Sequence, residues 1–205
     1  MSVGLLLTSA PTRLICLENT LNGTIFPQND ILEISKFARE NNILLHLDGA
    51  RLWHVAVETR MSLSELCAPF DSASLCLSKG LGAPVGTCLV GSKEFINKAR
   101  WFRKAFGGGM RQTGILAASA AYALSHNFPQ LPRVHALARR LQRGLEELGI
   151  GILYPAETCM VNEPGSLDHD SRLRILCRYS LTLLQLVLNT RRWSIVLLLF
   201  RCLSY

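Results

Sequence analysis

The sequence predicts an α/β fold in which a mainly parallel sheet is flanked by helices. Strand-like and helix-like segments alternate from about residue 14 to residue 148, and this alternation is typical of parallel sheets with helical crossovers. The apolar run at residues 43–47 is of the kind found in a buried parallel strand. The chain has no internal repeats, and its 205 residues are enough to bury a sizeable core.

Four short apolar segments are the expected strands. Each is bounded by polar residues or turn formers, and the last two are separated by a glycine-rich loop that contains Lys79. The expected strands are residues 14–17, 43–47, 71–77 and 87–90.

Five segments are expected to be helices, and three of them begin at residues that can cap a first turn. Asn29 or Asp30 caps the first helix, Ser62 the second and Ser92 the third. The fourth is rich in alanine and is expected to be buried, whereas the fifth is amphipathic and carries several arginines. The expected helices are residues 30–40, 63–67, 93–104, 115–124 and 133–148.

The net charge of +7 comes from the end of the chain. Residues 171–205 contain six arginines and no acidic residue, whereas residues 1–170 contain 16 basic and 15 acidic residues. We therefore expect no nucleic-acid partner for the body. A nucleic-acid binder driven by the tail is an alternative, and it would bind in a salt-sensitive way. The apolar runs of the tail are too short to span a bilayer, so we expect no membrane partner.

Seven cysteines are scattered along the chain without a CxxC pair or a zinc-like spacing. An odd, scattered set indicates reduced thiols rather than a disulfide framework. The N-terminal ten residues lack the basic start of a signal peptide. We expect a reducing compartment, namely the cytoplasm, with the mitochondrion left open.

The character of the chain changes near residue 160. A polar loop at residues 162–170 is followed by leucine and arginine without a clear period. We expect residues 1–160 to form the α/β domain. Residues 161–205 are expected to be a divergent tail, irregular or helical, whose ability to fold the sequence leaves open.

Lys79 is the first candidate for a catalytic role. A lone lysine in a loop is usually a surface residue, but this one follows an apolar strand. Gly80 and Gly82 also let the backbone come close to a ligand. We expect Lys79 to be desolvated, which favours the amine that a Schiff base to pyridoxal phosphate requires.

Asp48 and Arg51 are the candidates for the other side of such a site. Asp48 ends the second expected strand, and it either caps the next helix or pairs with the pyridine nitrogen of pyridoxal phosphate. If a helical turn begins at Asp48, Arg51 shares its face. Arg51 is then either the partner of Asp48 or a clamp on a cofactor oxygen or a substrate carboxylate. Asp48 and Lys79 both follow strands, and open α/β sheets bind ligands at the carboxyl ends of their strands.

Two further patterns carry less weight. His46, Asp48 and His54 could supply metal ligands, but strand alternation alone places His46 and Asp48 on one face, and we expect no metal. The triplet Gly107–Gly109 is usually only a flexible turn. Because Arg103, Lys104 and Arg111 flank it, it is also a candidate anion-facing loop.

Three runs closely resemble the L-threonine aldolases of the low-specificity type: Leu47–Leu52, Leu77–Gly86 and Arg103–Gln112. They occur in the family's order and spacing, and the resemblance extends over roughly residues 14–160. These aldolases are pyridoxal-phosphate enzymes of the aspartate-aminotransferase-like fold, and they are typically homo-oligomers with active sites at subunit interfaces. The resemblance therefore implies that residues 1–160 are part of a large domain of this fold.

The resemblance also implies roles for single residues. Lys79 forms the Schiff base to the cofactor, Asp48 pairs with the pyridinium nitrogen, and Arg51 contacts the phenolic oxygen or the substrate carboxylate. Lys104 and Arg111 resemble basic residues that line the active site. The implied reaction cleaves L-threonine or L-allo-threonine, as β-hydroxy-α-amino acids, to glycine and an aldehyde.

The chain also departs from the family pattern. Family members are about half as long again, and their N-terminal third, with the phosphate-binding loop and two active-site histidines, has no counterpart here. Leu21 stands where the family usually has histidine. The alternative to an active aldolase is therefore a catalytically impaired fragment or isoform that lacks the phosphate-binding part of the site.

Overall fold

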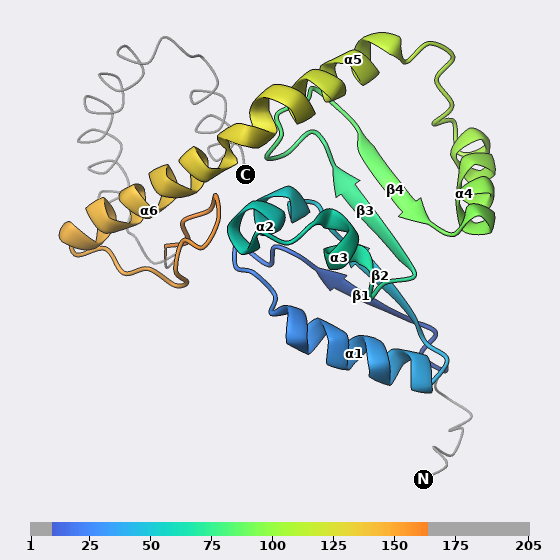
Figure 1. Cartoon of the computed structure of the whole chain (residues 1–205), viewed down its shortest axis with the longest axis horizontal. Coiled ribbons are helices and arrows are strands. Elements are labelled where there is room, and N and C mark those ends of the chain that lie inside the picture. Colours follow the sequence, from blue (N-terminus) through green and yellow to red (C-terminus); the bar gives the residue numbers. More distant parts are fainter. Residues whose placement is uncertain (1–9, 164–205) are drawn as a thin grey trace. The chain divides into compact units, whose positions relative to one another are not determined.

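A four-stranded sheet forms the centre of the region that the computed structural model describes, residues 10–163. The strands lie in the order β1-β2-β3-β4 (Figure 1). Strands β1, β2 and β3 are parallel, and β4 runs antiparallel to β3. The prediction of a mainly parallel sheet is confirmed. The strands are β1 (Leu14–Glu18), β2 (Leu44–Asp48), β3 (Ser72–Cys76) and β4 (Thr87–Gly91).

Helices connect the strands and continue beyond β4. Their bounds within the described region are α1 (Gln28–Glu40), α2 (Leu52–Thr59), α3 (Leu63–Cys67), α4 (Lys93–Ala105), α5 (Gly114–Tyr122) and α6 (Leu131–Glu147). A π-helical segment (Ala123–Asn127) and a 3₁₀ turn (Phe128–Gln130) join α5 to α6. Of these helices, α2 was foreseen only as an undefined helix after Asp48.

Two of the three predicted helix caps are confirmed. Ser62 and Glu65 form a reciprocal capping box at the start of α3, and the Ser92 hydroxyl accepts a hydrogen bond from the backbone N–H of Phe95 at the start of α4. The prediction for α1 is wrong, because this helix begins at Gln28 after Pro27 with no side-chain cap. Pro27 occupies the cap position with an extended ψ of 131°, and its carbonyl accepts the first helical hydrogen bond, from the N–H of Ile31 at 3.2 Å.

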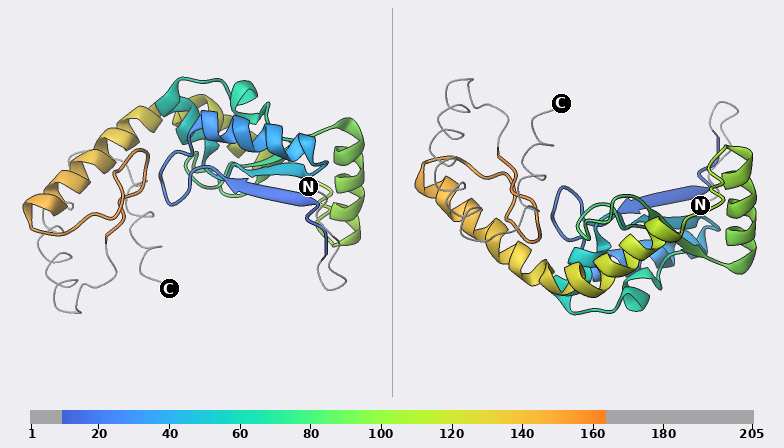
Figure 2. Two further views of the ribbon diagram at one scale, coloured as in Figure 1. Left: turned by 90° about the horizontal axis from the view of Figure 1, so that it is seen from below. Right: turned by 90° about the horizontal axis from the view of Figure 1, so that it is seen from above.

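One face of the sheet carries the core. Leu45 and Leu47 of β2 and Ala73 and Leu75 of β3 are buried and alternate with partly or fully exposed residues. Figure 2 shows α1, α2 and α3 on one side of the sheet. The buried apolar cluster combines this face with α2, with the loop after β3 and with Leu131 of α6. Burial is therefore concentrated around the element that follows Asp48.

The expectation that the alanine-rich segment 115–124 is buried is wrong. Within α5 only Ala120 is buried, and Ile115 and Tyr122 are 85% and 60% exposed. A helix that is apolar all round needs cover on several sides. The described residues cover only one side of α5.

The described residues, 10–163, group into one compact unit, and the expected domain boundary near residue 160 lies close to its end. This division stays a prediction, since the expected tail lies outside the described residues from residue 164 onward. Within residues 10–163 the structure contains no helix with the length and apolar character needed to cross a membrane.

Candidate active site

Asp48 and Lys79 lie toward the same edge of the sheet. Asp48 is the last residue of β2 and pairs in register with Ser74 of β3, while Lys79 follows the end of β3 by three residues. Because β2 and β3 are parallel, their carboxyl ends meet at one edge, as predicted. The backbone N–H of Gly49 donates to the carbonyl of Ser74 at 2.8 Å and joins the two strand ends directly.

Lys79 lies in a tight, hydrogen-bonded turn. Its carbonyl accepts from the N–H of Gly82 at 2.9 Å, and the carbonyl of Leu77 accepts from the N–H of Ala83 at 3.0 Å. Leu77 and Leu81 bury their side chains on either side, but Lys79 itself is exposed. The expectation of a desolvated lysine is therefore wrong for the described region. The apolar neighbours anchor the turn to the core and leave the amine on the outer side.

Asp48 does not cap α2. Its Oδ1 accepts a hydrogen bond from the N–H of Ala50 at 3.1 Å, but α2 begins only at Leu52, after Arg51 in the cap position. The expected helical turn starting at Asp48 is thus absent, and no ion pair joins Asp48 to Arg51 within residues 10–163. One carboxylate oxygen of Asp48 and the half-buried guanidinium of Arg51 are left available for a ligand.

Lys104 and Arg111 are not brought to Lys79 by any interaction of the described chain. Lys104 lies in the last turn of α4 and Arg111 in the loop before α5, and both are exposed. Among residues 10–163, no side-chain hydrogen bond or ion pair engages either of them. Their role as active-site lining, like the anion-facing role of Gly107–Gly109, stays a prediction.

A buried chain of polar side chains reaches the lysine turn and was missed by the sequence analysis. His54 Nδ1 lies 2.8 Å from His135 Nε2, and His135 Nδ1 lies 2.7 Å from Glu58 Oε2. Burial first, and then the charges of His135 and Arg51, lower the pKa of His54 to about 4. The signal was the spacing of His54 and Glu58, four residues apart and so on one face of α2.

From the sequence, His54 is a candidate only for binding a metal. Within the described part of the chain, no three His, Cys, Asp or Glu side chains gather as potential metal ligands. His46 instead contacts the Ser72 hydroxyl at 2.8 Å.

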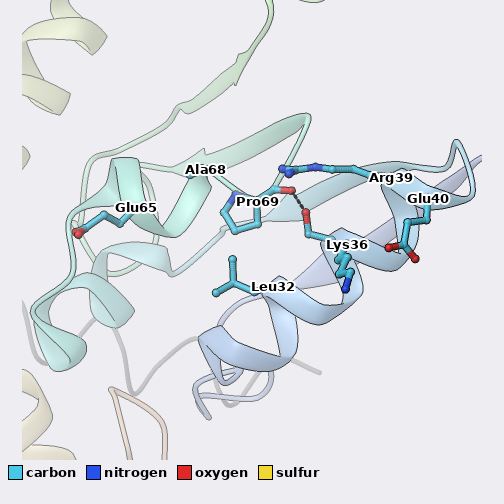
Figure 3. A pocket seen from close by; sticks show the side chains of 8 residues that line it. Leu32, Lys36, Arg39, Glu40, Glu65, Ala68 and Pro69 are labelled. Atoms are coloured by element: carbon cyan, nitrogen blue, oxygen red, sulfur yellow. Dashed lines mark hydrogen bonds between the residues drawn. The ribbon is translucent and has the colours of Figure 1, made fainter.

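A surface hollow of about 420 Å³ lies elsewhere, between α1 and the end of α3 (Figure 3). Pro69 precedes β3, and Arg39 and Glu40 precede β2, so this hollow lies toward the amino ends of the strands. It contains none of the predicted site residues. Its lining is Leu32, Ser35, Lys36, Arg39, Glu40, Glu65, Ala68 and Pro69.

The donor set at the carboxyl edge fits the ring end of pyridoxal phosphate. Lys79 offers an amine for the aldehyde carbon, Asp48 an oxygen for the ring nitrogen, and Arg51 a guanidinium for an anionic oxygen. Thr20 adds a hydroxyl that is buried and has no hydrogen-bond partner in the described structure. It follows Asn19, whose N–H donates to the carbonyl of Asp48 at 3.0 Å, so this unsatisfied group lies near the same edge.

The chain resembles known proteins over most of the described region. A family model described as beta-eliminating lyase matches residues 6–163. The chain is 52% identical over 152 residues to a probable low-specificity L-threonine aldolase of Schizosaccharomyces pombe, covering 74% of this chain and 40% of that protein. It is 50% identical over 153 residues to the low-specificity L-threonine aldolase of Candida albicans, covering 75% of this chain and 41% of that protein.

The fold is similar as well. A solved structure from Listeria monocytogenes, assigned as an L-allo-threonine aldolase, superposes with a TM-score of 0.66 at 28% identity and covers 73% of this chain and 43% of that one. The chain thus spans about 40% of the length of the curated relatives it matches.

These similarities agree with the geometry of the carboxyl edge. The motifs that carry Asp48, Arg51 and Lys79 lie inside the matched range. Pyridoxal phosphate is the cofactor that this family and fold imply. The chain belongs to the beta-eliminating lyase family.

Proposed function

We propose that this chain contributes the lysine side of the active site of a pyridoxal-phosphate-dependent aldolase. Its reaction cleaves the Cα–Cβ bond of L-threonine or L-allo-threonine and yields glycine and an aldehyde. The observation that carries the proposal is the placement of Lys79 and Asp48 at the carboxyl edge of adjacent parallel strands. The names of the S. pombe and C. albicans relatives support the substrate class.

Each residue at this edge has a distinct task. Bound pyridoxal phosphate supplies an electron sink for the bond that breaks. The exposed Lys79 amine holds the cofactor and carries a proton during turnover. The Asp48 carboxylate holds a proton on the ring nitrogen, and the Arg51 guanidinium orients an anionic oxygen of the cofactor or the carboxylate of the amino acid.

We propose further that the protein is a homo-oligomer in the cytoplasm. The five cysteines of the described region (Cys16, Cys67, Cys76, Cys88 and Cys159) are all free, which supports a reducing compartment. The exposed aromatic side chains of α4, among them Trp101 and Phe102, are typical of a surface that another polypeptide covers. Light scattering of the purified chain gives its oligomeric state.

The decisive experiment traps the cofactor on its lysine. The full chain is mixed with pyridoxal phosphate, reduced with borohydride and mapped by mass spectrometry. We expect the reduced cofactor on Lys79 and its loss in Lys79→Ala. The matched control is Lys36→Ala, which removes an exposed lysine of α1 at the other edge of the sheet and leaves the trapping unchanged.

The same variants test the reaction. With L-threonine as substrate, Lys79→Ala lowers the rate of aldehyde release by at least about 10²–10⁴-fold, the usual contribution of a positioned proton carrier. Cofactor trapped on Lys79 without aldehyde release would indicate the catalytically impaired form. Trapping that persists in Lys79→Ala would refute the assignment of the lysine.

A further inference from the structure

His54, His135 and Glu58 form a continuous hydrogen-bonded chain between two helices, and its two histidines are buried. His54 and His135 are 1% and 0% exposed, and their rings are tilted by 32° with centroids 5.1 Å apart. Arg139 closes the outer end of the chain by donating to Glu58 Oε1 at 3.1 Å. These hydrogen-bonded side chains therefore link α2 to α6 and reach the surface only at Glu58 and Arg139.

The hydrogen bonds link the three side chains in one order. The Glu58 carboxylate accepts only, so His135 donates to it from Nδ1. His135 Nε2 and His54 Nδ1 share the next hydrogen bond, at 2.8 Å. The other ring nitrogen of His54, Nε2, takes no part in it. This atom is buried and has no hydrogen-bond partner within the described residues.

The unpaired edge of His54 faces the backbone beside Lys79. A Cβ placed on Gly80 would collide with His54 Nε2 and would lie 2.7 Å from its Cδ2. The ring thus presses against the α-carbon of Gly80, where no other residue type has room. Glycine is required here for close approach, since its φ is not positive.

Both flanks of the turn are already held by other side chains. The Trp53 indole N–H donates to the carbonyl of Cys76 at 2.9 Å, and the Asn127 amide donates to the carbonyl of Leu81 at 2.7 Å. His54 contacts the turn between these two anchors, at the residue next to Lys79. Side-chain contacts thus hold the turn at Cys76, at Gly80 and at Leu81.

A buried polar chain is a costly way to fill space. Leucine or phenylalanine would occupy the position of His54 without the desolvation of its imidazole. The hydrogen bonds among His54, His135 and Glu58 add orientation, because they hold the His54 ring in one position rather than several. The burial that lowers the pKa of His54 also keeps the ring neutral.

We propose that His54 is a positioning residue for Lys79. Its imidazole, oriented by His135 and Glu58, determines how Gly80 is seated and thereby the direction in which the Lys79 side chain leaves the turn. The importance of that direction rests on the proposed function, in which Lys79 holds the cofactor. The placement of Lys79 by His54 does not depend on it.

The test compares His54→Ala with Ser35→Ala in the full chain. Ser35 is also buried, and it donates to the carbonyl of Pro69 at 2.7 Å, away from the lysine turn. Two reactions are followed by mass spectrometry: acylation of Lys79 by a small amine-reactive ester without cofactor, and borohydride trapping of pyridoxal phosphate. Lys36 is the internal reference for both.

We expect His54→Ala to lower the rate of cofactor trapping on Lys79 about tenfold, as misplacement of a reacting group by a fraction of an ångström does. The acylation rate of Lys79 relative to Lys36 also changes. Ser35→Ala lowers the melting temperature and changes neither ratio. If His54→Ala and Ser35→Ala give the same trapping rate and the same acylation ratio for Lys79, His54 only fills space and the proposal is overturned.

A double-mutant cycle tests the contact itself. Gly80→Ala alone collides with the ring and lowers trapping, whereas Gly80→Ala combined with His54→Ala has room for the new methyl group. The combined effect should therefore be smaller than the product of the single effects. Multiplicative effects would contradict the contact.

Two further measurements keep the proposal testable. If His54→Ala fails to fold, His54→Asn keeps a hydrogen-bonding partner for His135, lacks the Nε2 edge and gives the same change at Lys79. Nitrogen NMR of the unmodified chain should show a neutral His54 ring at pH 7, and a charged ring at that pH would contradict its burial against Gly80. If pyridoxal phosphate is never trapped on Lys79, the proposed function fails, while the acylation ratio still decides the role of His54.

Discussion

The centre of the sheet, formed by β2 and β3, and its β4 end differ sharply in how they are packed. Strands β2 and β3 alternate buried and open residues, and five of the eight residues of α2 are buried. All five residues of β4 are exposed, and none of the thirteen residues of α4 is buried. Both regions contain apolar side chains, but only the centre buries them within the described residues.

This difference separates the predicted site residues into two groups. Asp48, Arg51 and Lys79 are attached to a core that the described residues complete by themselves. Lys104 and Arg111 are attached to a helix and a loop without such a core. Local packing thus sets the positions of the first group of residues, whereas the positions of Lys104 and Arg111 depend on what covers α4.

The largest expected effect tests this contrast with two truncations. Leu47 of β2 is 1% exposed and Phe106, just after α4, is 83% exposed. Leu47→Ala should lower the free energy of unfolding by about 2–5 kcal/mol, because it leaves a cavity in the core. Phe106→Ala should change it by less than about 0.5 kcal/mol in the isolated chain. Urea unfolding followed by circular dichroism measures both.

The outcome for Phe106 sharpens the comparison. If Phe106→Ala destabilises the chain as much as Leu47→Ala does, then the β4–α4 end is packed in solution. The contrast between this end and the centre of the sheet is then wrong. The measurement should be repeated over a range of protein concentrations, since association would stabilise this end by mass action.

The second effect comes from His54 and follows pH. The pKa of His54 is about 4 in the folded chain, against an ordinary value of 6.5. Between these values an unfolded chain binds a proton that the folded chain does not, so stability is complete above pH 6.5 and is lost as the pH falls toward 4. The loss amounts to about 3 kcal/mol. Thermal melts between pH 7 and pH 4 measure it.

The control for this prediction is another histidine. His54→Asn removes the titrating group and should flatten this part of the pH profile, whereas His126→Asn changes an exposed histidine after α5 and should leave it unchanged. An unaltered profile in His54→Asn would show that other groups produce the acid sensitivity.

How far the sequence predicts this molecule depends on the range of the interactions involved. The caps at Ser62 and Ser92 involve residues three positions apart, and the sequence predicts both. The edge that carries Asp48 and Lys79 follows from strand order alone. The contact between His54 and His135 joins residues 81 positions apart, and no local pattern specifies that distance.

Burial was predicted less well than position. The exposure of Lys79 and of α5 depends on whether a second layer lies over them, which the composition of a segment does not determine. The apolar content of a helix indicates that its side chains have to be buried, and the fold determines whether other elements bury them.

The smallest effect again contrasts the core around β2 and β3 with the β4–α4 end, through the cap of one helix in each region. Ser62 caps α3, which buries Leu66 in the core, and Ser92 caps α4, which buries nothing within the described residues. Each serine→alanine change removes a cap worth about 1 kcal/mol. In Ser62→Ala the loss should appear in global unfolding, because α3 unfolds with the core. In Ser92→Ala it should appear only as faster hydrogen exchange of the α4 amides, because a helix without buried contacts opens locally. Equal changes in global stability would mean that α4 is coupled to the core as tightly as α3 is.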